Sequence, residues 1–135
     1  ERVCSLVGVS TRDEKVALGE AALKIDPTAS AMRVVNDYHG LSVTNLDDAV
    51  SPAALFRATT EHLIDDSAAM VGLIEKFTGK ASEVVIAGGW IKNPMIASAK
   101  NKQFGSYKVT DATEAGATGA AQFAGIAAGI FKLKI

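Results

Sequence analysis

The sequence predicts an α/β fold, in which a mixed sheet packs against helices. The strongest observation is the segment 83–93, EVVIAGGWIKN, where a short apolar, β-branched run stops at Gly88–Gly89. A run of this length that ends in glycines is typical of a buried strand followed by a tight turn. Asn93–Pro94 then opens a helix pattern from Met95 to Lys100, with proline in the first turn. Ser51–Pro52 opens the longest helix pattern in the same way, with serine as the N-cap.

Length and composition indicate one globular domain. The chain has 135 residues, of which 48% are hydrophobic and 21% are charged, an ordinary globular composition. The formal net charge of −1 and the absence of a basic block argue against nucleic acid as a partner. Cys4 is the only cysteine, which excludes an intramolecular disulfide. Because the apolar run after Glu1–Arg2 is too brief for a signal peptide, we expect a cytoplasmic protein.

The first third of the chain carries three local signals. Val3–Val9 is an apolar run that predicts a strand, and Thr11 with Glu14 forms a capping-box pattern. The helix that starts there is expected to end at Asp26–Pro27. Residues 36–40 are typical of a turn, and residues 41–44 follow as a short extended piece. Three side chains of the helix are expected to face a core: Val16, Ala22 and Leu23.

The helix that begins at Ser51–Pro52 is expected to end at Gly79, a good stop signal. Arg57 and Glu61 are four residues apart and can form an ion pair. Five apolar residues have the spacing of one helix face and are expected to be its buried side: Phe56, Leu63, Met70, Ile74 and Phe77.

The last third predicts one more strand, at residues 106–109, and a final helix from Glu114 to about Phe131 with Thr113 as its N-cap. Between Glu114 and Lys132 there is no charge, but the many glycines and alanines give too little apolar surface for a membrane span. We therefore expect a buried helix. Gly116 and Gly119 each cost about 1 kcal/mol in a helix, so we expect a backbone or a ligand to pack closely against them.

No metal site is expected. His39 and His62 are isolated from other ligand residues. The acidic pairs Asp47–Asp48 and Asp65–Asp66 could bind a metal, but adjacent acids on a helix point about 100° apart, so a solvated surface is the expected arrangement. Cys4 is expected to be a small buried hydrophobe.

The Gly-Gly segment is the best candidate for a binding site. Glycines after a strand let a flat or charged group approach the main chain. Taken alone, however, Gly88–Gly89 fits a plain strand-to-helix connection better than a binding site.

Four segments together resemble the C-terminal domain of the FGGY family of carbohydrate kinases. They follow in the family's order and spacing, and the resemblance spans residues 15–131. The segments are His39–Val43 (HGLSV), Phe56–Glu61 (FRATTE), Val85–Asn93 with its Gly-Gly turn, and Glu114–Ala121, which ends in Gly-Ala-Ala.

The resemblance implies part of an RNase-H-like domain of the actin-like ATPase type. It implies a parent enzyme that uses ATP and Mg²⁺ to phosphorylate a sugar or polyol hydroxyl. By position, Gly88 and Gly89 would line the adenosine, and Asn93 would contact the base or ribose. Glycines make a flat shelf for a purine, and an amide side chain can both donate and accept hydrogen bonds. Gly116 and Gly119 would be small because the last helix packs behind this shelf.

The chain also departs from the family pattern. Asn36 stands where the family has a glycine, four residues before Gly40. The family's catalytic aspartate follows a Gly-x-x pattern, whereas Asp13, the first aspartate here, lies in a helix cap. We therefore expect a partial, ATP-side C-terminal domain over residues 1–135, with no catalytic residue and no activity in isolation.

On this interpretation the sugar or polyol is bound by an N-terminal domain outside these residues. Truncation would also expose apolar surface, which makes a homodimer possible. Two alternatives stay open: a fragment of another actin-like ATPase, and a non-catalytic scaffold domain whose glycine turns are only structural.

Overall fold

The computed structural model describes residues 1–28, 32–46, 50–110 and 114–132. Helices dominate this part of the chain, and its strands are short. In order, the elements are α1 (Arg2–Leu6), α2 (Arg12–Leu23), β1 (Arg33–Asn36), β2 (Leu41–Thr44), α3 (Pro52–Thr78), β3 (Val85–Ile86), the 3₁₀ helix η1 (Gly89–Lys92), α4 (Pro94–Phe104), β4 (Lys108–Val109) and α5 (Ala115–Ala127).

The strand expected at Val3–Val9 is wrong, because this segment begins with helix α1. Its amides bond within the segment, for example from Val7 N to the Val3 carbonyl at 3.0 Å, so its backbone is satisfied without a neighbouring strand. The chain then turns at Gly8, whose φ is 73°. Val3 and Cys4 are buried by this helix, which confirms Cys4 as a small buried hydrophobe.

Helix α2 begins with the capping box that the sequence predicts. The Thr11 hydroxyl accepts from the Glu14 amide at 3.3 Å, and the Glu14 carboxylate accepts from the Thr11 amide at 2.9 Å. The helix ends at Leu23, three residues before Asp26. Of the three expected core residues, Ala22 is fully buried and Val16 is half-buried, but Leu23 is exposed. Leu18 faces the core instead.

Strands β1 and β2 form an antiparallel hairpin in which Val34 lies opposite Val43. Its turn is the one expected at residues 36–40, where the Asp37 carboxylate accepts from the His39 and Gly40 amides. The extended piece at residues 41–44 is confirmed as β2.

Helix α3 has the predicted ends. Ser51 accepts from the Ala54 amide at 3.1 Å, and Gly79 ends the helix with a φ of 80°. The Arg57–Glu61 ion pair is also present, at 3.0 Å.

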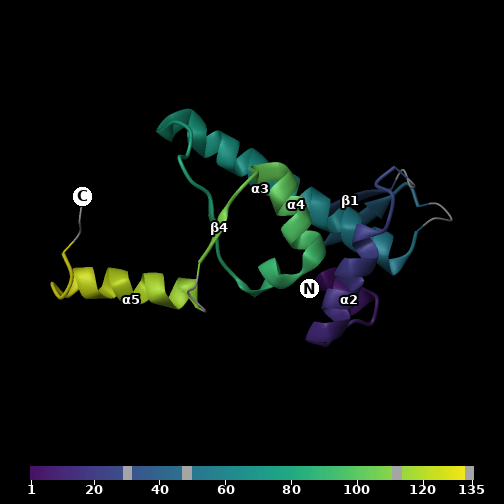
Figure 1. Ribbon diagram of the computed structural model, residues 1–135, viewed down its shortest axis with the longest axis horizontal. Helices are drawn as coiled ribbons and strands as arrows, with labels where there is room; N and C mark the ends of the chain where they lie inside the picture. The colour runs from purple at the N-terminus through teal and green to yellow at the C-terminus, as the bar shows by residue number, and fades with distance from the viewer. Residues whose placement is uncertain (29–31, 47–49, 111–113, 133–135) are drawn as a thin grey trace.

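The buried face expected along α3 is wrong beyond its first half. Phe56 is buried, but Phe77 at the far end is 90% exposed. The reason is length: α2, α4 and the hairpin pack on the first part of the helix, and the second half extends past them (Figure 1). Three residues of the expected face are therefore exposed, Met70, Ile74 and Phe77, and Leu63 before the middle of the helix is exposed as well.

The hydrophobic core lies where α3 meets α1, α2, α4 and strand β1. Met95 of α4 and Cys4 of α1 are its largest fully buried side chains. Around them the core is completed by Val3, Leu18, Ala22, Val34, Leu55, Phe56, Ile64 and Ala99.

The strands form two separate two-stranded sheets in the described residues. Strands β1 and β2 are antiparallel, whereas β3 and β4 are parallel, with Val85 opposite Lys108. The chain thus combines helices with small sheets, as an α/β class implies. The parallel and antiparallel pairings do not share one mixed sheet.

The buried final helix is also a wrong expectation. Helix α5 lies at the opposite end of the molecule from α2 (Figure 1), and its Phe123 is 73% exposed. No atom outside the local helix backbone lies within 4 Å of a Cβ added at Gly116 or Gly119, so the backbone expected to pack closely there is not present in the described structure, and the alternative of a ligand stays a prediction. Glycine and alanine leave this helix little side-chain area with which to hold a neighbour. Thr113, Asp47 and Asp48 lie outside the described residues.

None of the described helices is both long enough and apolar enough to cross a membrane.

The capping box predicts a pH dependence of stability. Hydrogen bonds from the backbone amides of Thr11 and Ser10, and from the Thr11 side chain, lower the Glu14 pKa from 4.5 to about 2. Because the folded pKa is depressed, the stabilisation is complete above pH 4.5 and is lost as the pH falls toward 2. Urea unfolding across this range should show the loss, and Glu14→Gln should reduce it. An NMR titration that places the Glu14 pKa near 4.5 would contradict this expectation.

The uncovered apolar face on the second half of α3 predicts self-association, since contiguous exposed apolar surface marks contact sites. The apparent mass in light scattering should rise with protein concentration. Ile74→Glu should reduce this rise, because it places a charge on the face. Leu46→Glu is the matched control, since Leu46 is exposed near the hairpin rather than on α3. A clean monomer at high concentration would rule out the prediction.

Candidate functional site

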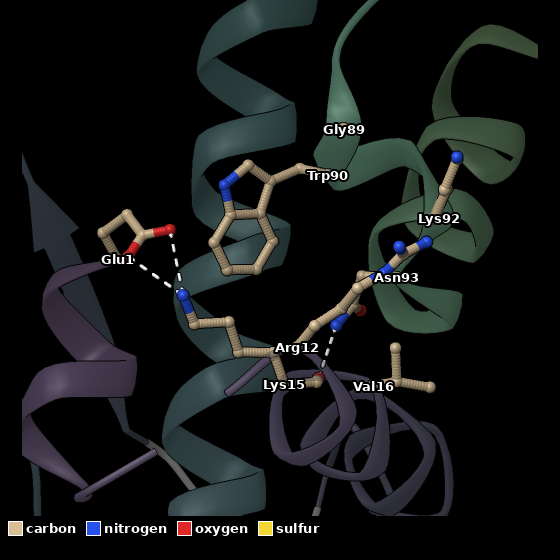
Figure 2. A pocket seen from close by; sticks show the side chains of 8 residues that line it. All are labelled: Glu1, Arg12, Lys15, Val16, Gly89, Trp90, Lys92 and Asn93. Carbon is tan, nitrogen blue, oxygen red and sulfur yellow. Dashed lines mark hydrogen bonds and ion pairs between the residues drawn. The ribbon is translucent and has the colours of Figure 1, made fainter. Parts of the chain in front are cut away.

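A pocket of about 400 Å³ lies between the start of α2 and the η1–α4 junction. It contains part of the Gly-Gly segment that the sequence singled out. Figure 2 shows the side chains that surround it. The lining residues are Glu1, Arg12, Lys15, Val16, Gly89, Trp90, Lys92 and Asn93.

The two glycines of the segment have different roles. Gly88 precedes η1 with φ 106° and ψ 154°, a conformation that residues with a Cβ rarely adopt. The backbone itself therefore requires glycine at this position. Gly89 does not have a positive φ, and no atom lies within 4 Å of a Cβ added to it. Only Gly89 of the two lines the pocket.

Asn93 is buried and acts as the N-cap of α4. Its Oδ1 accepts from the Met95 amide at 3.1 Å and from the Ile96 amide at 3.4 Å. Its Nδ2 donates to the Lys15 carbonyl of α2 at 2.7 Å, the hydrogen bond drawn in Figure 2. The amide is thus engaged within the protein and holds the pocket's two walls together. Its expected contact with a base or ribose stays a prediction.

Gly19 makes room for this amide. A Cβ at Gly19 would lie 2.8 Å from Asn93 Cγ and still closer to Asn93 Oδ1. Such an approach is shorter than van der Waals contact, so α2 can lie against the Asn93 amide at this point only if residue 19 is glycine. The sequence gives no local sign of this requirement, since the partner is far along the chain.

Trp90 supplies the aromatic face of the pocket. The Lys15 ammonium lies 5.4 Å from the centre of the indole ring, within the range of a cation–π interaction. The same ammonium lies 3.3 Å from a carboxylate oxygen of Glu1. Lys15 is therefore partly neutralised, and it holds one face of the indole.

Arg12 and Lys92 complete the positive charge of the pocket. Both residues are exposed, and neither has an ion-pair partner among the described residues. Sequence reasoning missed them together with Lys15 and Trp90. Trp90 and Lys92 could have been found, because they lie inside the Gly-Gly segment. Arg12 and Lys15 could not, since only the tertiary fold brings α2 to this segment.

The other segments of the family resemblance do not reach the pocket. Arg57 donates to the Ala22 and Ile25 carbonyls at 3.3 and 2.9 Å, so the FRATTE segment holds the end of α2. Residues 39–43 belong to the hairpin, and residues 115–121 belong to α5. The structure therefore brings together only the Gly-Gly segment and a part of α2 that the resemblance does not use.

A metal centre does not emerge from the described residues. They contain no group of three or more histidine, cysteine, aspartate or glutamate side chains that could hold an ion. The pocket itself is lined by one carboxylate and three cations. This donor set does not fit Mg²⁺, which prefers carboxylate and water oxygens.

No model of a known protein family matches the chain, and no curated protein matches it.

Asn93 should contribute to stability through both its cap and its bond to α2. Asn93→Ala should lower the free energy of unfolding by about 1 to 3 kcal/mol, from the lost cap and the lost hydrogen bond to the Lys15 carbonyl. Asn93→Asp keeps the cap acceptor but places a carboxylate oxygen against the Lys15 carbonyl, so it should also lower the free energy of unfolding. Asn101→Ala, at an exposed position of α4, is the matched control and should have little effect. Urea denaturation measures all three.

Gly19→Ala examines the same junction from the other side. The added methyl group should destabilise the wild type, and it should cost less in an Asn93→Ala background, where the obstructing amide is gone. Additive effects of the two substitutions would contradict the packing described here.

Proposed function

We propose that these 135 residues form the adenosine-binding part of an ATP-dependent carbohydrate kinase of the FGGY type. The parent enzyme would transfer the γ-phosphoryl group of ATP to a sugar or polyol hydroxyl. The observation that carries the proposal is Gly89, which lines the pocket although neither backbone strain nor a protein neighbour demands glycine there.

A ligand that approaches the main chain would explain Gly89. Glycine exposes the backbone of the η1 turn to the pocket, and a flat base could lie against it without meeting a side chain. Gly88 supports the same turn through its positive φ. The family resemblance assigns both glycines to adenosine, and the pocket geometry supports this assignment most directly for Gly89.

The chemistry of the pocket also supports a nucleotide. A volume of about 400 Å³ falls within the range of small-molecule sites. The indole of Trp90 offers an aromatic surface next to Gly89, and aromatic side chains stack favourably on bases. Arg12 and Lys92 provide positive charge for phosphates.

The reacting groups would lie elsewhere in the parent enzyme. The pocket's one carboxylate, that of Glu1, is engaged with Lys15, so no free acid is available there to act as a base. The proposal therefore assigns the catalytic aspartate, the Mg²⁺ ligands and the sugar or polyol site to parts outside the described residues. It also treats the two small sheets as part of a larger RNase-H-like domain in a cytoplasmic enzyme, and a homodimer as one possible assembly.

One observation favours the scaffold alternative. Gly88 and Asn93 both have structural reasons to be what they are, a positive φ and a helix cap. A non-catalytic domain would need them equally. Gly89 distinguishes the alternatives: a nucleotide-binding fragment, of an FGGY-type kinase or of another actin-like ATPase, would use it to bind ATP, whereas in a scaffold domain it would only belong to a connecting turn.

Titration of the chain with ATP by calorimetry tests the proposal. The wild type should bind weakly, and Gly89→Val should reduce the affinity about tenfold or more, because the valine side chain would occupy the base position. Gly116→Val is the matched control. Gly116 is equally free of neighbouring atoms but lies on α5, so the ATP affinity of this variant should equal that of the wild type. Thermal unfolding should verify that both variants fold.

Equal ATP affinity in the wild type and Gly89→Val would overturn the adenosine site. A separate assay addresses the extent of the active site: the isolated chain should release no ADP when a sugar is added. Sugar-dependent ADP release would contradict the assignment of the catalytic groups to another part of the enzyme.

A further inference from the structure

The charges of the pocket are unevenly distributed. Its ionisable lining side chains are Glu1, Arg12, Lys15 and Lys92, so three cations face one anion although the whole chain has a net charge of −1. Glu1 pairs with Lys15 at 3.3 Å. In Figure 2 this pair lies on one side of the Trp90 ring, and the side chains of Arg12 and Lys92 lie on the other. The unpaired positive charge is therefore confined to one side of the pocket.

The two unpaired cations come from different elements that one hydrogen bond joins. Arg12 is the first residue of α2, and Lys92 is the last residue of η1. The Asn93 Nδ2 bond to the Lys15 carbonyl joins these elements, one residue after Lys92 and three after Arg12. Two like charges that line the same side of a pocket repel each other. Such an arrangement is relieved when an anion binds between them.

We infer that Arg12 and Lys92 form a polyphosphate subsite, so that a bound nucleotide places its base at Trp90 and its phosphates between these two side chains. The inference rests on the proposed function for the base, whereas the anion subsite stands on the charges themselves. A guanidinium can bind two phosphate oxygens at once, and an ammonium adds a mobile point charge. The ligand class is a nucleoside diphosphate or triphosphate, whose affinity should increase with each phosphate.

The single tryptophan of the chain provides the readout. Trp90 fluorescence is followed while the 135-residue protein is titrated with adenosine, AMP, ADP, ATP or inorganic tripolyphosphate, in a buffer free of phosphate and sulfate. Calorimetry runs in parallel, so that binding without a fluorescence change is also detected. The affinity should rise from adenosine to ATP, and the ATP affinity should fall as salt is added.

Charge-removing variants locate the subsite. Arg12→Gln and Lys92→Gln should each weaken ATP and tripolyphosphate binding about tenfold, and should leave adenosine binding unchanged. Lys102→Gln is the matched control, because it removes the same charge from an exposed position near the other end of α4. It should leave the affinities for ATP and tripolyphosphate unchanged. Because Arg12 and Lys92 are exposed, both variants should keep the wild-type unfolding transition.

The outcomes separate the two proposals. Equal affinities for adenosine and ATP, with no effect of Arg12→Gln or Lys92→Gln, would overturn the phosphate subsite and leave the adenosine site standing. Tripolyphosphate binding that both variants lose, without any binding of adenosine, would support the subsite and overturn the proposed adenosine site. An equal loss of ATP affinity in Lys102→Gln would show that only the overall charge of the protein matters, and this result would also overturn the subsite.

Discussion

The hydrogen bond from Asn93 Nδ2 to the Lys15 carbonyl, 2.7 Å long and spanning 78 residues of sequence, is the interaction on which the site depends. It joins the start of α4 to the first turns of α2 in a partly buried position, where an unpaired side-chain amide would be costly. Gly19 allows the two helices to come this close. The same contact sets the distance between Arg12 on one wall of the pocket and Gly89 on the other. Asn93 is therefore best understood as the residue that positions the site.

The molecule combines a well-packed body with an uncovered extension, and the pocket belongs to the body. Helices α2 and α4 pack on the first half of α3, where Phe56 and Met95 are buried. The second half of α3 and all of α5 carry exposed apolar side chains. The segment before the pocket runs through β3, which links the two parts (Figure 1). A ligand at Gly89 would thus bind at the point where the chain enters the body.

Helix caps were predicted correctly from the sequence, although the short apolar run Val3–Val9 begins with a helix and not the expected strand. Thr11 and Ser51 are the N-caps of their helices, because a cap needs only its own next three amides. Burial was predicted poorly, since it depends on which elements are near. Phe77 has the spacing of a core residue, yet nothing packs over it in the described structure. The candidate site divides in the same way: Gly89 could be found from its turn, whereas Arg12 reaches the pocket only through the tertiary fold.

The most direct measurement of the central claim is hydrogen–deuterium exchange with and without ATP. If a nucleotide binds between η1 and the start of α2, ATP should slow exchange both in residues 87–93 and in residues 12–16, because the ligand would contact both walls. Exchange in α5 should be unchanged, which makes that helix an internal reference. Unchanged exchange in residues 87–93 at saturating ATP would contradict the account and would favour a scaffold whose Gly-Gly turn is only structural.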